Sequence, residues 1–258
     1  MRTWTAFASG LALCLLSLRS SIATDNSALK DEIRQRWLGR LDGRHFTAIV
    51  LLLLEHDGKS EKRKVAVWRD DENGRERLMA RFEEPYDMRG VGLLYIQNFD
   101  RPNDYFLYQP STGKVRRIAE SLAREDIYGI DLEYLGFGVA QREPVDVENA
   151  DFDMLDGHRV LRLVQHARST NPRFDQEVVW IDPSSYIPLQ VVHYRHGDVV
   201  LRVRTEQVES IQGVPTPVRS SFEREARQET VLMSVEHIDY ESTIPDAYFS
   251  TFSLVEKR

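Results

Sequence analysis

The chain has 258 residues, of which 41% are hydrophobic and 29% charged, and its formal net charge is −7. This composition is typical of a folded globular protein and excludes a largely disordered chain. The negative charge leaves no basic footprint for nucleic acid, and runs as short as Arg116-Arg117 do not change that conclusion.

Residues 1–23 have the pattern of a cleavable signal peptide. Arg2 gives a positive start, a leucine-rich stretch follows, and Ser21-Ile22-Ala23 has the small-x-small form of a cleavage site. The apolar stretch ends at Arg19 and is short for a membrane span. We therefore expect export to the periplasm and a single mature domain over residues 24–258.

The chain's one cysteine, Cys14, lies in this first segment. Leu13 precedes it where a lipid-attachment site needs a small residue, so a lipid anchor is not expected. Cleavage after Ala23 would leave a mature protein without cysteine. That would remove disulfides, thiol catalysis and thiolate metal sites together.

Residues 25–43 are predicted to form one amphipathic helix. Leu29, Ile33, Trp37 and Leu41 recur every four residues on one face, and Gly43 can end the helix. Two interpretations stay open, because such a helix can pack on a sheet or can act as a lid over an apolar cavity.

From residue 45 onward, the pattern changes to short strands and tight turns. Residues 45–55 are apolar on both faces, which predicts a buried strand. Tight turns are expected at Asp57-Gly58, Asn73-Gly74, Asp156-Gly157 and Gly197-Asp198. Residues 120–138 break the pattern as a loop or short helices, and residues 249–254 are expected to add a short edge strand. About a dozen strands at this spacing predict a mainly β domain, either a sandwich or a barrel.

Two stretches suggest metal binding but are explained better by other structures. His193 and His196 are three apart on a strand and so point to opposite faces, which predicts surface histidines beside a turn. Residues 151–157 are acidic like a calcium loop, but Leu155 stands at a ligand position and no glutamate closes the loop. A hairpin turn is expected there instead.

The sequence lacks the usual catalytic motifs. It contains neither a Gly-x-Ser-x-Gly elbow nor a phosphate-binding glycine loop. Glu223-Arg224-Glu225 alternates in charge, as a solvated strand face would. No cofactor, metal or catalytic residue is therefore predicted, and a hydrolase with carboxylates paired by the fold is kept only as a third hypothesis.

Aromatic side chains concentrate in the first group of strands: Trp68, Phe82, Tyr95, Phe106 and Tyr108. An antiparallel sheet must hide one face, with its own core, a helix or a ligand. Core packing and a partly ligand-filled groove are both compatible with this pattern.

The stretch from Pro85 to Asp131 resembles a known family. It contains, in order, Arg89-Gly90, Leu93-Leu94-Tyr95-Ile96, Asp104-Tyr105, Leu107-Tyr108-x-Pro110, Lys114-Val115-Arg116-Arg117-Ile118 and Gly129-x-Asp131. This order and spacing are similar to those of LolA-like outer-membrane lipoprotein-sorting proteins, and Ile244-Pro245-Asp246 with Phe249 resembles the end of that family.

The resemblance implies a curved antiparallel sheet, an incomplete barrel, with an N-terminal helix and short helices on its concave side. It implies an apolar cavity for acyl chains, a lipid or an acylated protein as partner, and a monomeric carrier working between the two membranes beside an RND-type transporter. The residues we expect to contact the ligand are Trp37, Trp68, Phe82, Leu94, Ile96, Phe106, Tyr108 and Ile118. The residues expected to maintain the motif are Arg89, Gly90, Asp104, Pro110, Arg116, Arg117, Gly129 and Asp131.

The residues of this motif also have a physical interpretation of their own. Gly90 and Gly92 permit a bend or a close backbone approach. Arg116 and Arg117 point to opposite faces of a strand, so one can turn inward and pair with Asp104 or Asp131, or both can lie in water at a sheet edge.

Two functional hypotheses from different classes follow. The first is a non-enzymatic periplasmic carrier of a lipid-like ligand, whose affinity comes from buried apolar area at about 0.8 kcal/mol per methylene. The second is a periplasmic sensor or transporter-accessory protein that binds a polypeptide with the same sheet.

Overall fold

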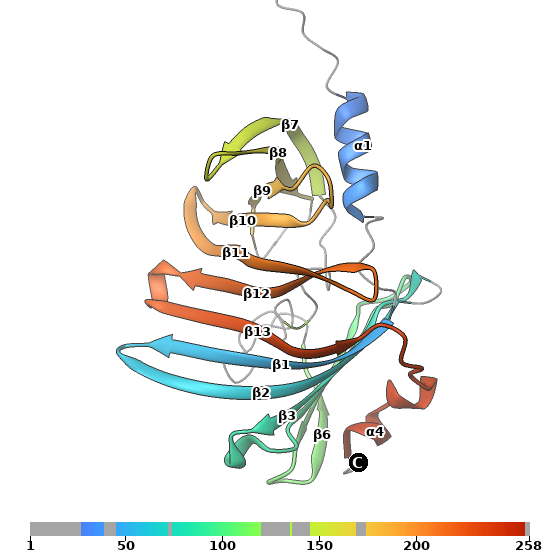
Figure 1. Cartoon of the computed structure of the whole chain (residues 1–258). Helices are drawn as coiled ribbons and strands as arrows, with labels where there is room; N and C mark the ends of the chain where they lie inside the picture. The colour runs from blue at the N-terminus through green and yellow to red at the C-terminus, as the bar shows by residue number, and fades with distance from the viewer. Residues whose placement is uncertain are drawn as a thin grey trace, which may run out of the picture.

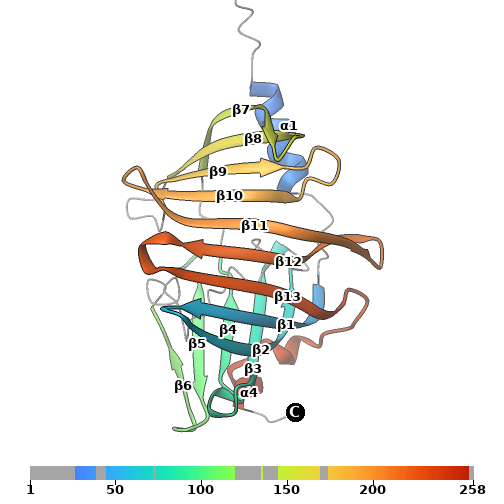
Figure 2. The ribbon, with the colours of Figure 1, turned by 60° about the vertical axis from the view of Figure 1, so that its left-hand side comes forward.

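The computed structural model describes residues 27–38, 45–71, 74–119, 135, 145–168 and 174–255. Figures 1 and 2 show one long curved sheet, with α1 (Ser27–Leu38) near one end and α4 (Thr251–Val255) near the other. The expected signal peptide, the first and last residues of the expected helix, and all of residues 120–138 except Leu135 lie outside the described residues.

Thirteen strands form a single antiparallel sheet. In chain order they are β1 (His45–His56), β2 (Lys59–Asp70), β3 (Arg77–Glu84), β4 (Gly92–Ile96), β5 (Asp104–Gln109), β6 (Lys114–Arg117), β7 (Val145–Leu155), β8 (His158–Ala167), β9 (Gln176–Ile181), β10 (Pro188–Arg195), β11 (Asp198–Ile211), β12 (Val214–Arg224) and β13 (Glu229–Asp239). Single-turn 3-10 helices lie at Tyr86–Met88, Glu225–Arg227 and Asp246–Tyr248.

The strand order in space is β6-β5-β4-β3-β2-β1-β13-β12-β11-β10-β9-β8-β7. The sheet is curved but not closed, because β6 and β7 remain at its two edges. The expectation of a mainly β, incomplete barrel is therefore confirmed. The hairpin turns at Asp57-Gly58 and Asp156-Gly157 are also confirmed, with all four residues at positive φ as a type I′ turn requires.

The concave face of the sheet carries the main core. Its apolar side chains come from β1–β5 and β11–β13, and Leu135 packs among them. At the other end, Ile33 of α1 packs against Leu163, Val179 and their neighbours on the same face of β7–β9. The helix therefore packs on the sheet, as the first of the two interpretations of residues 25–43 proposed.

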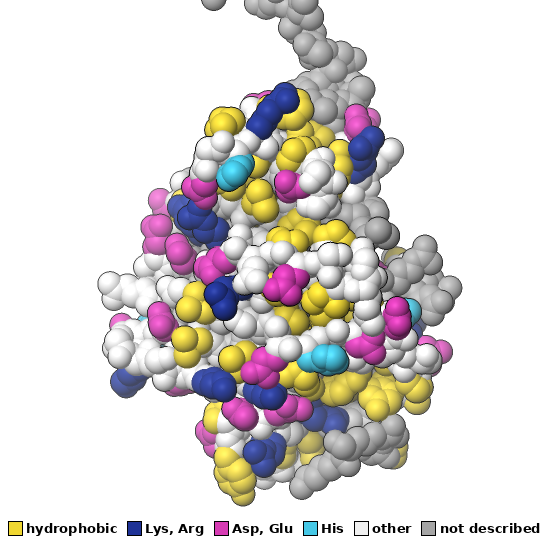
Figure 3. Space-filling model, in the orientation of Figure 1, with side chains coloured by type: hydrophobic (Ala, Val, Ile, Leu, Met, Phe, Trp, Pro, Cys, Tyr) yellow, Lys and Arg dark blue, Asp and Glu magenta, His cyan; other side chains and the backbone are white. Residues whose placement is uncertain are grey.

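The convex face is mostly a solvent surface. Figure 3 shows acidic and basic side chains interspersed with apolar ones over the side turned to the viewer. Strand β1 alternates strictly between buried and half-buried residues, so the prediction of a strand buried on both faces was wrong. Ile49, Leu51 and Leu53 face outward and are half-buried.

Two boundaries differ from the prediction. The turn expected at Gly197-Asp198 is formed instead by His196 and Gly197, with φ of 55° and 89°. Asp198 is already the first residue of β11. Residues 249–254 form no edge strand. Two of their apolar side chains, Phe249 and Leu254, pack across the convex face of β2–β6 rather than beside an edge.

Candidate binding site

The concave face is the candidate site because apolar side chains make up most of it. Phe46, Val50 and Leu52 of β1, and Leu78 and Ala80 of β3, are at most 1% exposed. The rings of Tyr95 and Tyr105 stack beside them with centroids 5.2 Å apart. These side chains form the apolar core of the concave face, and an apolar environment of this kind favours hydrocarbon over polar groups.

Polar side chains interrupt this wall at the end where the β1–β2 and β12–β13 hairpins lie. Arg224 of β12 donates from Nη1 to Glu229 of β13, 2.5 Å away, and is 7% exposed. The prediction of a solvated strand face at residues 223–225 was therefore wrong for Arg224, because the strand turns that side chain toward the concave core.

His193 contradicts its prediction in the same way. Its side chain is 2% exposed, its ring stacks on Phe174 at 4.1 Å, and Nδ1 lies 3.2 Å from Oε2 of Glu177. Strand β10 is interior to the sheet, and His193 shares the concave face with Leu201. His196 is exposed, as expected. Within the described ranges, no group of three His, Cys, Asp or Glu could hold a metal ion.

The sheet splits between β12 and β13. These strands pair only from Arg219/Ser234 to Arg224/Glu229, while β13 continues along β1 and β12 continues along β11. A pocket of about 310 Å³ opens in the split, which we call the sheet window. It is lined by Gln207, Glu209, Ile211, Val218, Arg219, Ser234, Val235, Glu236, His237 and Ile238.

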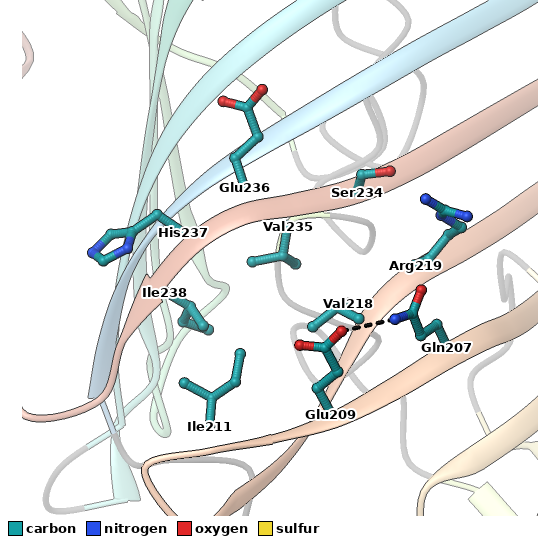
Figure 4. Close-up of a pocket in the computed structure, with 10 residues that line it drawn as sticks. All are labelled: Gln207, Glu209, Ile211, Val218, Arg219, Ser234, Val235, Glu236, His237 and Ile238. Atoms are coloured by element: carbon teal, nitrogen blue, oxygen red, sulfur yellow. Dashed lines mark hydrogen bonds between the residues drawn. The ribbon is translucent and has the colours of Figure 1, made fainter.

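The window leads toward the apolar interior. Figure 4 shows Ile211, Val218, Val235 and Ile238 gathered at its centre, while Glu236 and His237 point away. Ile238 belongs to the concave core, and Ile211 and Val235 pack against it. Gln207, which also lines the window, is exposed. Its side-chain amide donates a hydrogen bond to Glu209 over 2.7 Å.

Two prolines explain why the ladder stops. The two-residue turn Gln212-Gly213 makes Ile211 and Val214 a hydrogen-bonded pair, so Val214 directs its backbone groups toward β11. Alternate residues share an edge, so Pro215 and Pro217 face β13 instead and have no N–H to donate. Sequence reasoning missed the window, although Pro-Thr-Pro inside a strand was the available signal.

Side chains close the far end of the window. Gln212 donates from Nε2 to Asp239, 2.9 Å away, and accepts from the backbone N–H of Tyr240 at 2.7 Å. The Tyr240 hydroxyl lies 2.9 Å from that of Thr216, which is fully buried. The hydrogen bond from Gln212 holds the pKa of Asp239 below its usual value. Hydrogen bonds therefore bound the split at both ends, between the paired parts of β12 and β13 at one end and among these side chains at the other.

The sequence-predicted ligand residues lie on two different faces. Phe82 and Ile118 lie in or against the concave core. Trp37 belongs to α1, and its side chain lies outside the described part. The remaining five pack on the convex face beneath the C-terminal segment: Trp68, Leu94, Ile96, Phe106 and Tyr108.

The C-terminal segment, residues 244–255, is tied to that convex face. Arg77 of β3 donates to Asp246 at 2.8 Å, and its guanidinium lies 4.5 Å from the centre of the Phe249 ring. Arg81 donates to the carbonyl oxygens of Ser253 and Leu254. The C-terminal segment therefore already packs over the aromatic residues of the convex face.

The family motif serves packing and turn geometry. Gly90 adopts a φ of +83°, and a Cβ there would lie 3.3 Å from Cγ of Pro110. Arg89 donates from Nε to the carbonyl of Glu83, 3.1 Å away. Both glycine functions inferred from the sequence, a bend and a close approach, are present here. Gly129 and Asp131 lie outside the described residues.

Arg116 and Arg117 are both exposed on the edge strand β6, as the second alternative proposed. Arg117 nevertheless pairs with Asp104, with Nη2 to Oδ1 at 2.7 Å. Asp104 also accepts from Arg101 at 2.9 Å and from Asn98 at 3.1 Å. These hydrogen bonds lower the pKa of Asp104 to about 2, and the bond from Arg101 has the largest effect.

Asp104→Asn should therefore lower the free energy of unfolding at pH 7 by about 2 kcal/mol. The folded pKa lies below the unfolded value, so this stabilisation is complete above about pH 4 to 5 and disappears as the pH falls toward 2. Urea unfolding of both proteins between pH 7 and pH 3 checks this. A difference that stays constant down to pH 3 would contradict the charge-based explanation.

These features define a class of protein, an unclosed antiparallel β-barrel with an apolar concave face. A family model described as uncharacterized protein-like matches residues 74–256, and the chain belongs to that family. Its fold is LolA-like. No curated protein matches the sequence. No helix among the described residues is both long and apolar enough to cross a bilayer.

Solved structures share the fold at low sequence identity. A putative outer membrane lipoprotein-sorting protein domain from Vibrio parahaemolyticus has a TM-score of 0.77 and 18% identity, covering 87% of this chain and 97% of its own. A DUF1329 family protein from Desulfovibrio piger has a TM-score of 0.74 and 18% identity, covering 88% and 96%. A LolA superfamily protein from Nitrosomonas europaea has a TM-score of 0.68 and 15% identity, covering 87% and 98%.

Proposed function

We propose that the protein binds a hydrophobic, lipid-like ligand against the concave face of its sheet and carries it through the periplasm. The observation that supports this most is the extended, mostly apolar wall from β5 to β11. Each Å² of the ligand's hydrocarbon surface that leaves water in such a site contributes about 25 cal/mol. The sheet window is an opening in the sheet, and apolar residues of the concave core line it.

The finer parts of the proposal have separate supports. Periplasmic location is supported by the signal-peptide pattern of residues 1–23. Traffic between inner and outer membranes is supported by the likeness to a lipoprotein-sorting domain. Cooperation with an RND-type transporter, and a lipid or acylated protein as cargo, are supported by the family resemblance alone.

Methionines already in the chain give a direct test. Met88 and Met233 lie on the concave face, whereas Met79 lies on the convex face beneath the C-terminal segment. Met79 and Met233 are each 1% exposed, so they form a matched pair. With methionine-methyl-labelled protein and an unlabelled fatty acid, we expect intermolecular NOEs to Met233 and Met88 and none to Met79.

The outcome also distinguishes the two faces. NOEs to Met79 alone would place the ligand under the C-terminal segment, near Trp68 and Phe106, and would overturn the concave site. Absence of every NOE, together with no retention of the fatty acid during gel filtration, would overturn the carrier function itself. Methionine-to-leucine variants assign the signals.

A further inference from the structure

Arg63 is a buried cation in the apolar wall. It lies on β2, directly opposite Leu52 of β1, and shares the concave face with Val65 and Val67. The residue is 8% exposed. Its sequence neighbours Lys62 and Lys64 point to the other face, where they lie 4.0 Å from Glu84 and 3.0 Å from Glu236.

The hydrogen bonding of Arg63 is incomplete. Nη2 donates to Oε2 of Glu61, 2.8 Å away, and the Glu61 side chain is itself 65% exposed. Nε and Nη1 are buried and have no hydrogen-bond partner in the part of the chain that the structure describes. Arg69, six residues along the same face, instead has Glu76 at 3.0 Å and Asp71 at 2.9 Å.

An arrangement of this kind calls for an acceptor. Buried N–H groups in folded proteins nearly always have a partner, and a guanidinium stays charged in any environment. Oxygens that carry negative charge are its strongest acceptors, because the hydrogen bonds are then charge-assisted. Glu61 satisfies one nitrogen from the solvent side, while Nε and Nη1 have no acceptor among the described residues.

We propose that Arg63 binds the acidic head group of the ligand, a carboxylate or phosphate on a long alkyl chain. The alkyl chain of the ligand would lie along the neighbouring wall formed by Leu52, Leu54 and Val65. This inference rests on the proposed function, because it names the substrate class of the same concave site. Arg63 thereby selects acidic amphiphiles over neutral ones of equal chain length.

The test uses competition for an uncharged fluorescent probe, N-phenyl-1-naphthylamine, on purified protein at pH 8. The competitors are dodecanoate, dodecyl phosphate and dodecan-1-ol. The variants are Arg63→Met and Arg63→Lys, with Arg116→Met as the control, since Arg116 is an exposed arginine on edge strand β6. The wild type and the control should prefer one or both acidic competitors over the alcohol by about ten- to hundredfold.

Arg63→Met should lose that preference while still binding the probe and the alcohol, and Arg63→Lys should keep part of it. Preference for carboxylate over phosphate, or the reverse, identifies the head group. Equal affinities for all three competitors in the wild type, or an unchanged preference in Arg63→Met, would overturn the inference and leave the carrier function intact. Failure of the wild type to bind the probe or any competitor would instead overturn the carrier function.

A second readout follows Arg63 in the wild-type protein itself. The Nε–H resonance of Arg63 in the wild type, identified by its disappearance in Arg63→Lys, should move downfield with the acidic competitor and stay in place with dodecan-1-ol. A resonance that dodecanoate and dodecyl phosphate leave unmoved would contradict the assignment of Arg63 to the head group.

Discussion

Arg69→Met should lower the free energy of unfolding by about 3–5 kcal/mol. Arg69 is 1% exposed on the concave face and donates from Nε to Glu76, whose side chain is 10% exposed. It also donates from Nη2 to Asp71. Removing the cation would leave the Glu76 carboxylate buried without its partner, which costs far more than the pair itself contributes. Chemical unfolding at pH 7 measures the difference.

Arg63→Met is the matched control, because it makes the same replacement on the same face of the same strand. We expect it to be neutral or slightly stabilising. It removes two buried donors that have no hydrogen-bond partner among the described residues, and it leaves Glu61 with a side chain that is 65% exposed. Equal losses of stability for the two variants would show that both arginines are structural. That outcome would remove the main reason for assigning Arg63 to the ligand.

The strand plan was predictable because its signals are local. Asp-Gly turns fix two hairpins, since both residues can adopt positive φ, and alternation of polar and apolar residues marks the strands between them. The family resemblance supplied the curvature and the incomplete closure. Neither property follows from the alternation of any single strand.

The choice of face was not predictable. Alternation separates Val67 from Trp68 on the same strand but does not say which of them faces the concave side. Here apolar side chains lie on both faces of β2–β5, and the C-terminal segment packs on those of the convex face. The apolar residues of that segment were predicted as a strand, since spacing over six residues does not separate a strand from a helical turn.

Polar residues in the wall were hidden for a related reason. His193 and Arg224 stand among charged or aromatic neighbours that suggest solvent, and only the register places them on the face of Leu201 and Phe222. Arg63 lies in the basic run Lys62-Arg63-Lys64, which suggests an exposed strand. Burial of its central member depends on the curvature of the whole sheet.

Gly92→Val should destabilise the protein by about 3 kcal/mol, at the upper end of the cost of overpacking. Gly92 begins β4, and a Cβ there would lie 2.8 Å from Cδ2 of Leu254, which is 1% exposed. The new side chain would push α4 off the convex face and expose the apolar residues around Met79 and Leu94.

A double-mutant cycle separates this contact from a general effect on β4. Leu254→Ala alone should cost about 2–5 kcal/mol, because it opens a cavity under α4. With Gly92→Val in the same chain, the total should fall clearly below the sum, because the valine would occupy the space that Leu254 left. Additive costs would mean that Gly92 matters for the strand and not for the close approach of the C-terminal segment.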